Sequence, residues 1–588
     1  MSSRSLFLRE RTITDSRNPK CFKMPRSGGD TLKVKALVAV DFGTTFSGLC
    51  WALTDKPQDT QLIQQWPGEA ASHDKVPTTL LYRRNGSHFW GYEIKGTVLR
   101  HEWFKLGLYS EAEESDLVRD YPSLTALHTV YGEYDNEQLV IDYLTSLRKH
   151  AEKAMESNYG PYLFSKMARE YIITVPAVWS DRAQDRTRRC AQQAGMGDHV
   201  QIITEPEAAG IYALATIPAI GLNINDTFVL CDAGGGTVDL VSYTVAALKP
   251  IPVLYEAASG SGELCGSIFL NRIFAQLLKD RFENYPNWDK TYQADALKAF
   301  EDDIKKNFMG DTTQRYIIPA RGLHKPELGI RRGNLEISGQ DIRDIFEQVI
   351  PKIIALVKGQ IRDTQKPVKA VLLAGGFGLS DYLRERIQDA VGEHVEVRKV
   401  ANGATAIVRG ALIRGLSEKQ PGLATIRVKS RVARRHYGTV AYEYFVEGKH
   451  DESRRRPSPF GDRDRVEAMQ WFIKKNSHIE DSNPVRTLHE FYWDLSVLNG
   501  PPRVIEMTIY VSESPVPPLY LDSNVSQLVK LSVNVSRIPP GKFPRERGMG
   551  HQWFYKIPYK IETTIHSGSI RFALVYNEER FEAKAEFV

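Results

Sequence analysis

The sequence predicts two related α/β lobes with a cleft between them, followed by a smaller β-rich domain. Two apolar segments, 36–40 and 227–230, each run into an acidic residue, then glycine and threonine, then further β-type residues. A continuous apolar run of this kind is typical of a buried strand, and the turn after it carries the functional groups. After about residue 415, short alternating runs replace helical patterns. We therefore expect a duplicated α/β unit and a β-sandwich.

Length and composition narrow the class of protein. At 588 residues, the chain exceeds what one hydrophobic core normally supports, so we expect two or three domains. Its 42% hydrophobic and 25% charged residues are typical of a globular protein. The 77 basic and 72 acidic residues leave a net charge of only +5, which argues against a dedicated nucleic-acid binder. No run of about 18 apolar residues exists, so no membrane-spanning helix is expected.

Cysteine usage and the N-terminal segment favour an intracellular protein. No CxxC pair is present, and this pattern is typical of reduced proteins. Residues 1–33 are basic but lack the apolar core of a secretory signal, and acidic residues interrupt the pattern of a mitochondrial presequence. We expect a disordered tail there and a cytoplasmic location, with the nucleus as an alternative. The cysteines are Cys21, Cys50, Cys190, Cys231 and Cys265.

The turns after the two apolar segments have the composition of a phosphate site. Glycines can adopt the positive φ angles that aim successive N–H groups at an anion, and threonines add hydroxyl donors. Asp41 and Asp232 stand at the strand ends, where they could hold Mg²⁺ through its water shell. No GxxxxGK[ST] sequence is present, which excludes a P-loop enzyme. We predict that ATP phosphates bind at Gly43, Thr44, Thr45, Gly234, Gly235, Gly236 and Thr237.

Other segments fit α/β layers. Residues 171–175 and 368–373 are predicted strands. A helix is expected to begin after Ser180 and to stop at Gly195, and another to begin near Ser380. Beyond the α/β region, the predicted strands are 438–446, 471–473, 504–511, 531–535, 559–565 and 570–575.

These motifs resemble the ATPase domain of the 70-kilodalton heat-shock (DnaK-like) protein family over about residues 34–415. The resemblance implies an actin-like ATPase fold of two ribonuclease-H-like lobes. The similar stretches are the two phosphate motifs (41–47 and 232–239), the connecting motif (174–177 and 204–210), the adenosine motif (374–377) and the second connecting helix (402–411).

The resemblance also implies roles for the residues of these motifs. Asp41 and Asp232 would hold hydrated Mg²⁺, and Thr44 and Thr45 would contact phosphate. Three further residues would lie beside the γ-phosphate or order the metal waters and the attacking water: Thr237, Glu205 and Asp239.

A lysine is expected in the same site, because phosphoryl transfer is catalysed mainly by positioning and by neutralising charge. In the family, the catalytic lysine follows a glycine by four residues after a strand that begins with proline and serine or threonine. Here residues 76–79 lead to Gly91 and Lys95. The resemblance therefore nominates Lys95, and a solvated lysine is the alternative.

The adenosine would bind between a charged helix and the third glycine pair. Asp302 and Lys305 have the family's three-residue spacing, although a solvent-facing helix is an equal alternative. Gly375 and Gly376 would let the base and ribose approach the backbone, and Phe377 follows them.

The chain also departs from the family's usual pattern. Glu207 stands where the common chaperones have threonine, and Phe377-Gly378-Leu379 replaces Ser-Thr-Arg, which removes an arginine near the adenine. Ala404 stands where an acid is expected. Residues 415–422 replace the usual acidic, leucine-rich linker. These departures resemble a distant, atypical branch of the family.

The C-terminal part resembles the family's peptide-binding β-sandwich in pattern, without a helical lid before Val588. Exposed aromatic residues such as 491–493 and 553–555 could line a client groove, although a role in the core is favoured. The expected division is a tail at 1–33, an ATPase domain at 34–415, a linker at 416–436 and a β-sandwich at 437–588.

We therefore expect a slow ATP hydrolase with chaperone-like action, using ATP/ADP and Mg²⁺. Its expected partners are unfolded or apolar polypeptide segments, with co-chaperones or a nucleotide-exchange factor, and neither nucleic acid nor membrane. The alternative is a nucleotide-binding scaffold with negligible turnover and a dedicated protein partner. A small-molecule kinase is disfavoured, because no sugar-binding motif or catalytic base is apparent.

Overall fold

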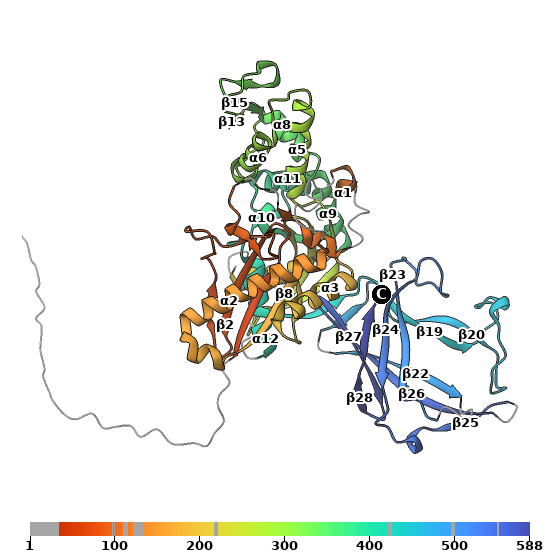
Figure 1. The fold of residues 1–588 in the computed structure, drawn as a ribbon. Coiled ribbons are helices and arrows are strands. Elements are labelled where there is room, and N and C mark those ends of the chain that lie inside the picture. Colours follow the sequence, from red (N-terminus) through yellow and green to blue (C-terminus); the bar gives the residue numbers. More distant parts are fainter. Residues whose placement is uncertain are drawn as a thin grey trace, which may run out of the picture.

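A computed structural model describes residues 35–96, 98, 100–109, 116–121, 134–216, 221–419, 426–481, 483–494, 500–549 and 552–588. In Figure 1 the C-terminal strands extend to one side of a larger α/β part. The tail expected at 1–33 lies outside the described residues.

The first lobe is built on a six-stranded sheet that carries the first phosphate motif. β1 (Lys35–Asp41) is antiparallel to β2 (Phe46–Leu53) and parallel to β8 (Ala168–Val175), and Asp41 at its end pairs with Gly48. The apolar residues of β1 are fully buried, as expected for a strand inside a core. Across the sheet run β3 (Lys56–Leu62), β2 (Phe46–Leu53), β1 (Lys35–Asp41), β8 (Ala168–Val175) and β9 (Gln201–Thr204), with β4 (Val76–Pro77) paired to β2.

The second lobe repeats this hairpin on a seven-stranded sheet. β10 (Thr227–Ala233) is antiparallel to β11 (Val238–Ala247), which places Asp232 opposite Asp239. It is parallel to β16 (Val368–Ala374). Both predicted hairpins are therefore present. Across the sheet run β17 (Glu396–Lys399), β16 (Val368–Ala374), β10 (Thr227–Ala233), β11 (Val238–Ala247), β12 (Val253–Glu263), β18 (Arg427–Val432) and β21 (His478–Glu480).

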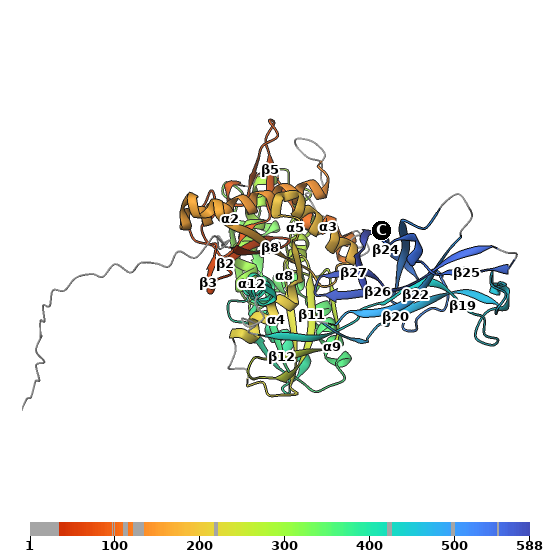
Figure 2. The same ribbon diagram turned by 90° about the horizontal axis from the view of Figure 1, so that it is seen from below.

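Two helices pack between the lobes. Buried residues of α4 (Glu205–Thr216) and α12 (Ala406–Lys419) form one hydrophobic cluster with the inner faces of β1 and β10. Figure 2 shows both helices between the two sheets. The remaining helices of the α/β part are α1 (Asp116–Asp120), α2 (Asn136–Lys166), α3 (Asp181–Ala191), α5 (Ile268–Phe282), α6 (Lys290–Ala299), α7 (Lys305–Asn307), α8 (Gly339–Phe346), α9 (Ile350–Asp363), α10 (Gly375–Gly378) and α11 (Asp381–Val391).

The helix starts predicted from serines are confirmed. The Ser180 hydroxyl accepts a hydrogen bond from Ala183 N, and the Ser380 hydroxyl accepts one from Leu383 N. The first of these helices ends in a turn at Gly195, whose φ of 83° suits glycine. Small sheets complete the α/β part: β5 (Thr79–Tyr82), β6 (His88–Trp90) and β7 (His101–Glu102), and β13 (Arg315–Pro319), β14 (Ile330–Arg331) and β15 (Asn334–Ser338).

The C-terminal part consists of two antiparallel sheets with buried apolar residues between them. Ile505, Val529, Ile557 and Phe572 come from both sheets and join one cluster. The predicted β-sandwich stays our interpretation of this arrangement. One sheet contains β20 (Arg465–Ile473), β19 (His436–Tyr444), β23 (Val504–Ser512), β24 (Ser526–Asn534) and β29 (Lys584–Phe587), and the other β22 (Val485–Asp494), β26 (Trp553–His566), β27 (Ser569–Tyr576), β28 (Glu579–Glu582) and β25 (Arg545–Arg547).

The segment expected as a linker, 416–436, includes regular structure at both ends. α12 continues to Lys419, and β18 joins the second-lobe sheet parallel to β12. β21, which follows the first C-terminal hairpin, pairs antiparallel with β18 and extends the same sheet. Sequence patterns missed β18 because only Val428 and Val432 among its six residues are apolar and three are basic, one of which, Arg431, is buried by a tertiary contact. The exact domain boundary stays a proposal.

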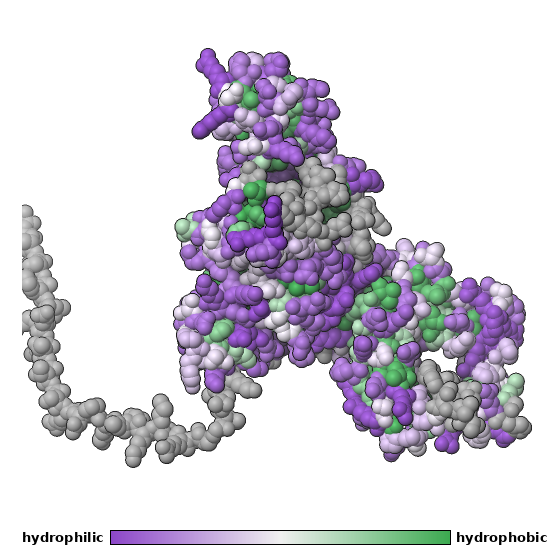
Figure 3. Space-filling model, in the orientation of Figure 1, coloured by the Kyte–Doolittle hydropathy of each residue, from purple (hydrophilic) through white to green (hydrophobic). Residues whose placement is uncertain are grey.

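The surface differs between the two parts. In Figure 3 hydrophilic residues cover most of the visible α/β part, while hydrophobic residues gather over the C-terminal sheets. The same view shows a hollow in the C-terminal part. Within the described ranges, no helix is both long and apolar enough to cross a membrane.

Candidate functional site

Four buried carboxylates converge where the two lobes meet. Asp41 ends β1, Asp232 and Asp239 face each other across the β10–β11 hairpin, and Glu205 opens α4. None is more than 7% exposed. Not every carboxylate oxygen in the group accepts a hydrogen bond. Asp232 Oδ1 and Asp239 Oδ2 have no donor within the described structure. A buried unpaired carboxylate oxygen is costly, so this arrangement calls for a cation or its waters.

The pKa values of these carboxylates also favour a bound cation. Burial raises the pKa of Asp232 well above its usual value, and the neighbouring carboxylates Glu205, Asp239 and Asp41 raise it further. Burial likewise raises the pKa of Glu205 to about 7, against the effect of Lys105. A hydrated Mg²⁺ would relieve this repulsion, so these residues fit that ion. Over the described residues, no three histidine, cysteine or acidic side chains form a group that could hold a metal.

The turns of the two phosphate motifs pack closely against each other. A Cβ atom on Gly235 would lie 2.4 Å from Thr45 Oγ1, and one on Gly236 would lie 2.6 Å from Thr44 Oγ1. Only glycine therefore lets the two turns approach so closely. The expectation of positive φ is wrong for Gly43 and for 234–236, because none of these residues has a positive φ. The glycines are required by space and not by backbone conformation.

The third glycine pair lies beside the same carboxylates. Gly375 has a φ of 77°, and a Cβ there would lie 2.5 Å from Asp232 Oδ1. Nothing lies within 4 Å of the Cβ position of Gly376, so its backbone is open to a ligand. The Phe377 ring is instead buried in the second-lobe core against Phe346. Only the Phe377 backbone is therefore available for a contact with nucleotide.

The structure separates the two residues nominated for the adenosine. Lys305 is buried and donates to Asn271 Oδ1 at 3.0 Å and to Glu301. Asp302 is exposed and lies 3.6 Å from Lys298. Glu301 and Lys305 are four residues apart, a spacing that places two side chains on the same face of a helix. The family's three-residue spacing nominated Asp302, and it missed Glu301 on the same helix and Asn271 on α5.

The lysine nominated for catalysis is not in the carboxylate cluster. Lys95 has a side chain that is 63% exposed, and its Nζ lies 3.5 Å from Glu69 Oε2. Two other lysines occupy the cluster. Lys105 Nζ donates to Glu205 Oε1 at 2.7 Å, and Lys75 Nζ lies 2.7 Å from Asp41 Oδ2. The sequence carried one signal for Lys105, which lies inside the apolar run 103–108. A segment on the surface of a soluble protein would not require such a run.

Comparison with known proteins settles the family. The family model described as Hsp70 protein matches residues 116–419, which is more than half of the chain. The chain belongs to the Hsp70 family. Heat shock 70 kDa protein 12A of Homo sapiens is 26% identical over 516 residues, covering 70% of this chain and 73% of that protein. Heat shock 70 kDa protein 12B of Homo sapiens is 24% identical over 540 residues, covering 74% and 75%.

A bacterial chaperone is also similar. The Chaperone protein HscA homolog of Janthinobacterium sp. (strain Marseille) is 26% identical over 384 residues, covering 62% of this chain and 55% of that protein. These identities make the chain a divergent Hsp70. The family has the actin-like ATPase fold, and that is the fold of the two lobes described here.

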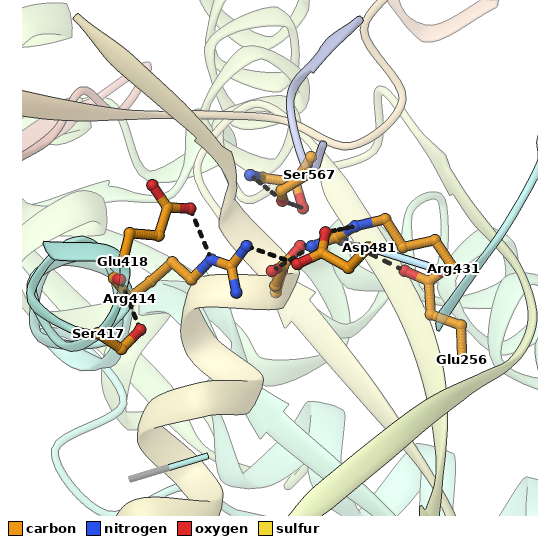
Figure 4. A network of polar contacts seen from close by, with 9 residues as sticks. Glu256, Arg414, Ser417, Glu418, Arg431, Asp481 and Ser567 are labelled. Atoms are coloured by element: carbon orange, nitrogen blue, oxygen red, sulfur yellow. Dashed lines mark hydrogen bonds and ion pairs between the residues drawn. The ribbon is translucent and has the colours of Figure 1, made fainter. Parts of the chain in front are cut away.

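In this Hsp70, the residue that departs from the usual threonine has a buried partner. Glu207 is 2% exposed, and Arg431 of β18 donates to both of its carboxylate oxygens, at 2.8 Å to Oε1. Arg431 Nε also donates to Asp481 Oδ1 at 3.0 Å, just after β21. Arg414 of α12 donates to Asp481 Oδ2 at 2.9 Å. Figure 4 labels Arg414, Arg431 and Asp481 of this group. We call the four residues Glu207, Arg414, Arg431 and Asp481 the interdomain ion-pair network.

The network is electrostatically satisfied. Burial would raise the pKa of Glu207, but the Arg431 guanidinium more than offsets this and holds it below the usual value. Arg431 and Arg414 do the same for the pKa of Asp481. Glu256 completes the group by accepting a hydrogen bond from Val432 N at 2.7 Å. The Glu207 departure is therefore explained by the arginine that the altered linker segment supplies.

The turn between β26 and β27 makes a second contact between the parts. Thr204 N donates to Ser567 Oγ at 2.9 Å, and the two hydroxyls lie 3.1 Å apart. A Cβ on Gly568 would lie 2.5 Å from Ile202 Cγ2, so glycine is needed for the turn to reach β9. The C-terminal sheets thus contact the residues directly before α4.

The C-terminal part contains a cleft of about 1630 Å³. Met507 and Leu531 line it from one sheet and Leu488 and Tyr559 from the other. Of the aromatic residues proposed for a groove, Trp553 is 48% exposed while Tyr555 is buried in the core. The side chains of Phe491, Tyr492 and Trp493 lie outside the described structure. Basic residues on the cleft wall are Arg454, Arg456, Arg465, Lys530 and Lys584.

Proposed function

We propose that this Hsp70 protein binds and slowly hydrolyses ATP, and that nucleotide state controls polypeptide binding by its C-terminal β domain. One observation carries the coupling. The first turn of α4 presents Glu205 to the carboxylate cluster and Glu207 to Arg431 of the interdomain ion-pair network. Side chains two positions apart in a helix point about 200° away from each other. The contacts of Glu205 and Glu207 therefore hold this turn from opposite sides. A shift on one side is therefore transmitted to the other.

The cleft between the lobes suits Mg²⁺ with ATP. Thr44 and Thr45 would meet the phosphates opposite the 234–236 turn, and Asp41 and Asp232 would hold the ion through its waters. The bound ion would supply positive charge for the developing transition state. Glu205 and Asp239 would order the attacking water, with Thr237 beside the γ-phosphate, as expected from the family motifs. The adenosine would lie against the open backbone of Gly375 and Gly376.

The polypeptide would lie in the C-terminal cleft. Its volume of about 1630 Å³ is larger than a typical small-molecule pocket of about 300–1,000 Å³ and suits an extended chain segment. Apolar side chains from both sheets line it, so an apolar segment is the expected occupant. Co-chaperones or a nucleotide-exchange factor would act on the α/β part, as the family relationship implies.

The alternative is a nucleotide-binding scaffold that hardly turns over. The position of Lys95 favours it, because the nominated catalytic lysine lies outside the carboxylate cluster. The presence of Lys75 and Lys105 in that cluster favours hydrolysis instead.

Phosphate release under single-turnover conditions distinguishes the two functions. We expect slow release by the natural protein and about 100-fold slower release by Asp232→Asn, because that change removes a charge that would hold the metal. The control is Asp302→Asn, on the exposed face of its helix, which should retain the natural rate. A natural protein that binds a fluorescent ATP analogue but releases phosphate no faster than Asp232→Asn would instead establish the scaffold.

A further inference from the structure

We propose that the C-terminal cleft selects apolar polypeptide segments that carry acidic side chains, and that arginines on its wall bind those carboxylates. The inference rests on the proposed function, because it names the class of polypeptide for the same cleft. The arginines lie on the loop between β19 and β20 and at the first residue of β20. They are Arg454, Arg456 and Arg465.

The charges on the cleft wall are unbalanced at these arginines. Among the described residues that line the cleft, five are basic and three are acidic. Lys530 lies directly opposite Glu586, a position where opposite charges stabilise a sheet. Lys584 stands in the same row of side chains as Glu506. The third acidic residue, Glu467, is the one that lines the cleft beside three arginines, so the positive excess lies with the arginines.

Two of the arginines directly face each other. Arg456 and Arg465 form an antiparallel bridge, in which each backbone N–H donates to the other's carbonyl at 2.8 Å. Side chains opposed in this way project to the same face, where like charges repel each other. Arg465 Nη2 lies 3.4 Å from Asp462 Oδ2. Arg456 Nη1 donates to the carbonyls of Ser453 and Arg455, and within the described residues it has no ion pair. A bound carboxylate would offset the repulsion, and the fork of an arginine suits it.

The loop that carries the arginines is fastened to the opposite sheet. Met549 N donates to Pro459 O at 2.7 Å. The ring of Phe460 meets that of Phe554, on β26, edge to face with 5.2 Å between centroids. The Arg465 guanidinium lies 5.3 Å from the Phe460 ring centroid. The arginine side of the cleft is therefore held in place before a ligand binds, which lowers the entropic cost of binding.

A buried histidine on the opposite wall also indicates a polar ligand. His489 of β22 lines the cleft and is 7% exposed, and its Nε2 has no hydrogen-bond partner within the described residues. Burial lowers the pKa of His489, so the ring is neutral at pH 7 and can pair with a backbone group of a peptide. A buried unpaired nitrogen costs free energy that such a peptide would recover. Leu488 beside it is 61% exposed and offers the apolar contact.

Matched peptides test the selection. Three peptides of equal length share an apolar core and differ at two flanking positions, which are glutamate, glutamine or lysine. Acetylated and amidated ends leave these side chains as the only charges. Binding to the full chain without nucleotide is measured by fluorescence anisotropy. We expect the glutamate peptide to bind about tenfold more tightly than the glutamine peptide, and the lysine peptide to bind most weakly.

Variants assign this preference to the arginines. The double replacement Arg454→Gln and Arg456→Gln should reduce the tenfold ratio to within about twofold, by weakening the glutamate peptide. Both side chains are exposed, so the fold should be retained, and thermal unfolding checks this. The matched control is Arg463→Gln. Arg463 is on the same loop but packs on the Tyr444 ring outside the cleft wall, so the ratio should persist. Added salt should weaken the glutamate peptide more than the glutamine peptide.

The outcomes separate this inference from the proposed function. Equal affinity for the glutamate and glutamine peptides would overturn the inference, and so would an unchanged ratio in the double variant. Tighter binding of a single-stranded RNA than of the glutamate peptide would assign the arginines to phosphates and overturn it as well. If ATP changes none of the affinities, the coupling in the proposed function fails while the acidic preference stands. If none of the peptides binds, both fail.

Discussion

Replacing Arg431 by alanine is expected to make β18 easier to open by about 3–5 kcal/mol. That is the usual cost of removing one partner of a buried ion pair. Arg431 is 5% exposed and satisfies both carboxylate oxygens of Glu207, which is itself 2% exposed. Alanine would leave Glu207 buried with no direct cationic partner. The strand would then leave the second-lobe sheet more often.

Hydrogen exchange of the β18 amides measures this effect directly, because it reports the free energy of local opening. Protease sensitivity around 426–437 gives an independent reading. The control is the double replacement of Glu207 by leucine and Arg431 by methionine. Asp481 keeps Arg414 in that variant, and Glu256 keeps the hydrogen bond from Val432 N, so exchange should return toward the natural rate. Equal opening in the single and double variants would show that the ion pair does not hold β18.

The effect should extend to nucleotide coupling. Arg431→Ala should still bind a fluorescent ATP analogue, since Arg431 lies outside the cleft that holds the carboxylates. Its affinity for an apolar peptide should no longer change with nucleotide, because Glu207 is the link from α4 to β18. A variant that retained the nucleotide dependence would place the coupling in the contact between Thr204 and Ser567 instead.

Replacing Gly410 by alanine is expected to destabilise the protein by about 3 kcal/mol or more. A Cβ there would lie 1.7 Å from Ala208 O and 2.5 Å from the Ala208 carbonyl carbon. The obstacle is backbone of α4, which cannot turn aside as a side chain can, so the two helices must separate. Overpacking usually costs about 1–3 kcal/mol, and a backbone clash belongs at the top of that range. Separation would also displace Glu205 and Glu207 on the adjoining turn.

Gly359 provides the matched control for this change. It also lies inside a helix, α9, but the nearest atom to its Cβ position is Arg362 Nη2 at 3.8 Å. Alanine there should stabilise the protein by about 0.5–1 kcal/mol through helix propensity. Gly415 is intermediate, because its Cβ would meet the end of the Leu37 side chain at 2.5 Å. Urea unfolding midpoints should follow the order Gly359→Ala, Gly415→Ala, Gly410→Ala, from highest to lowest.

The sequence by itself determined the duplicated hairpins, the phosphate-motif glycines and the carboxylates at the strand ends. These features are local. A buried strand needs a continuous apolar run, and a turn that another turn approaches closely needs glycine. Each requirement is therefore visible in a sequence pattern of a few residues. Asp41 and Asp232 could be assigned to one site from the sequence, because both follow the same kind of strand.

Only the tertiary structure decided which charged residues meet. Lys75 and Lys105 reach the carboxylates while Lys95 does not, and Glu207 finds Arg431 across more than two hundred positions of sequence. A lysine or glutamate has the same local pattern on a surface as in a buried pair, so neither periodicity nor spacing can tell them apart. Burial and pairing arise when distant segments pack together. For that reason the cluster of carboxylates and glycines could be predicted from the sequence, but not the lysines that join it or the arginine that pairs with Glu207.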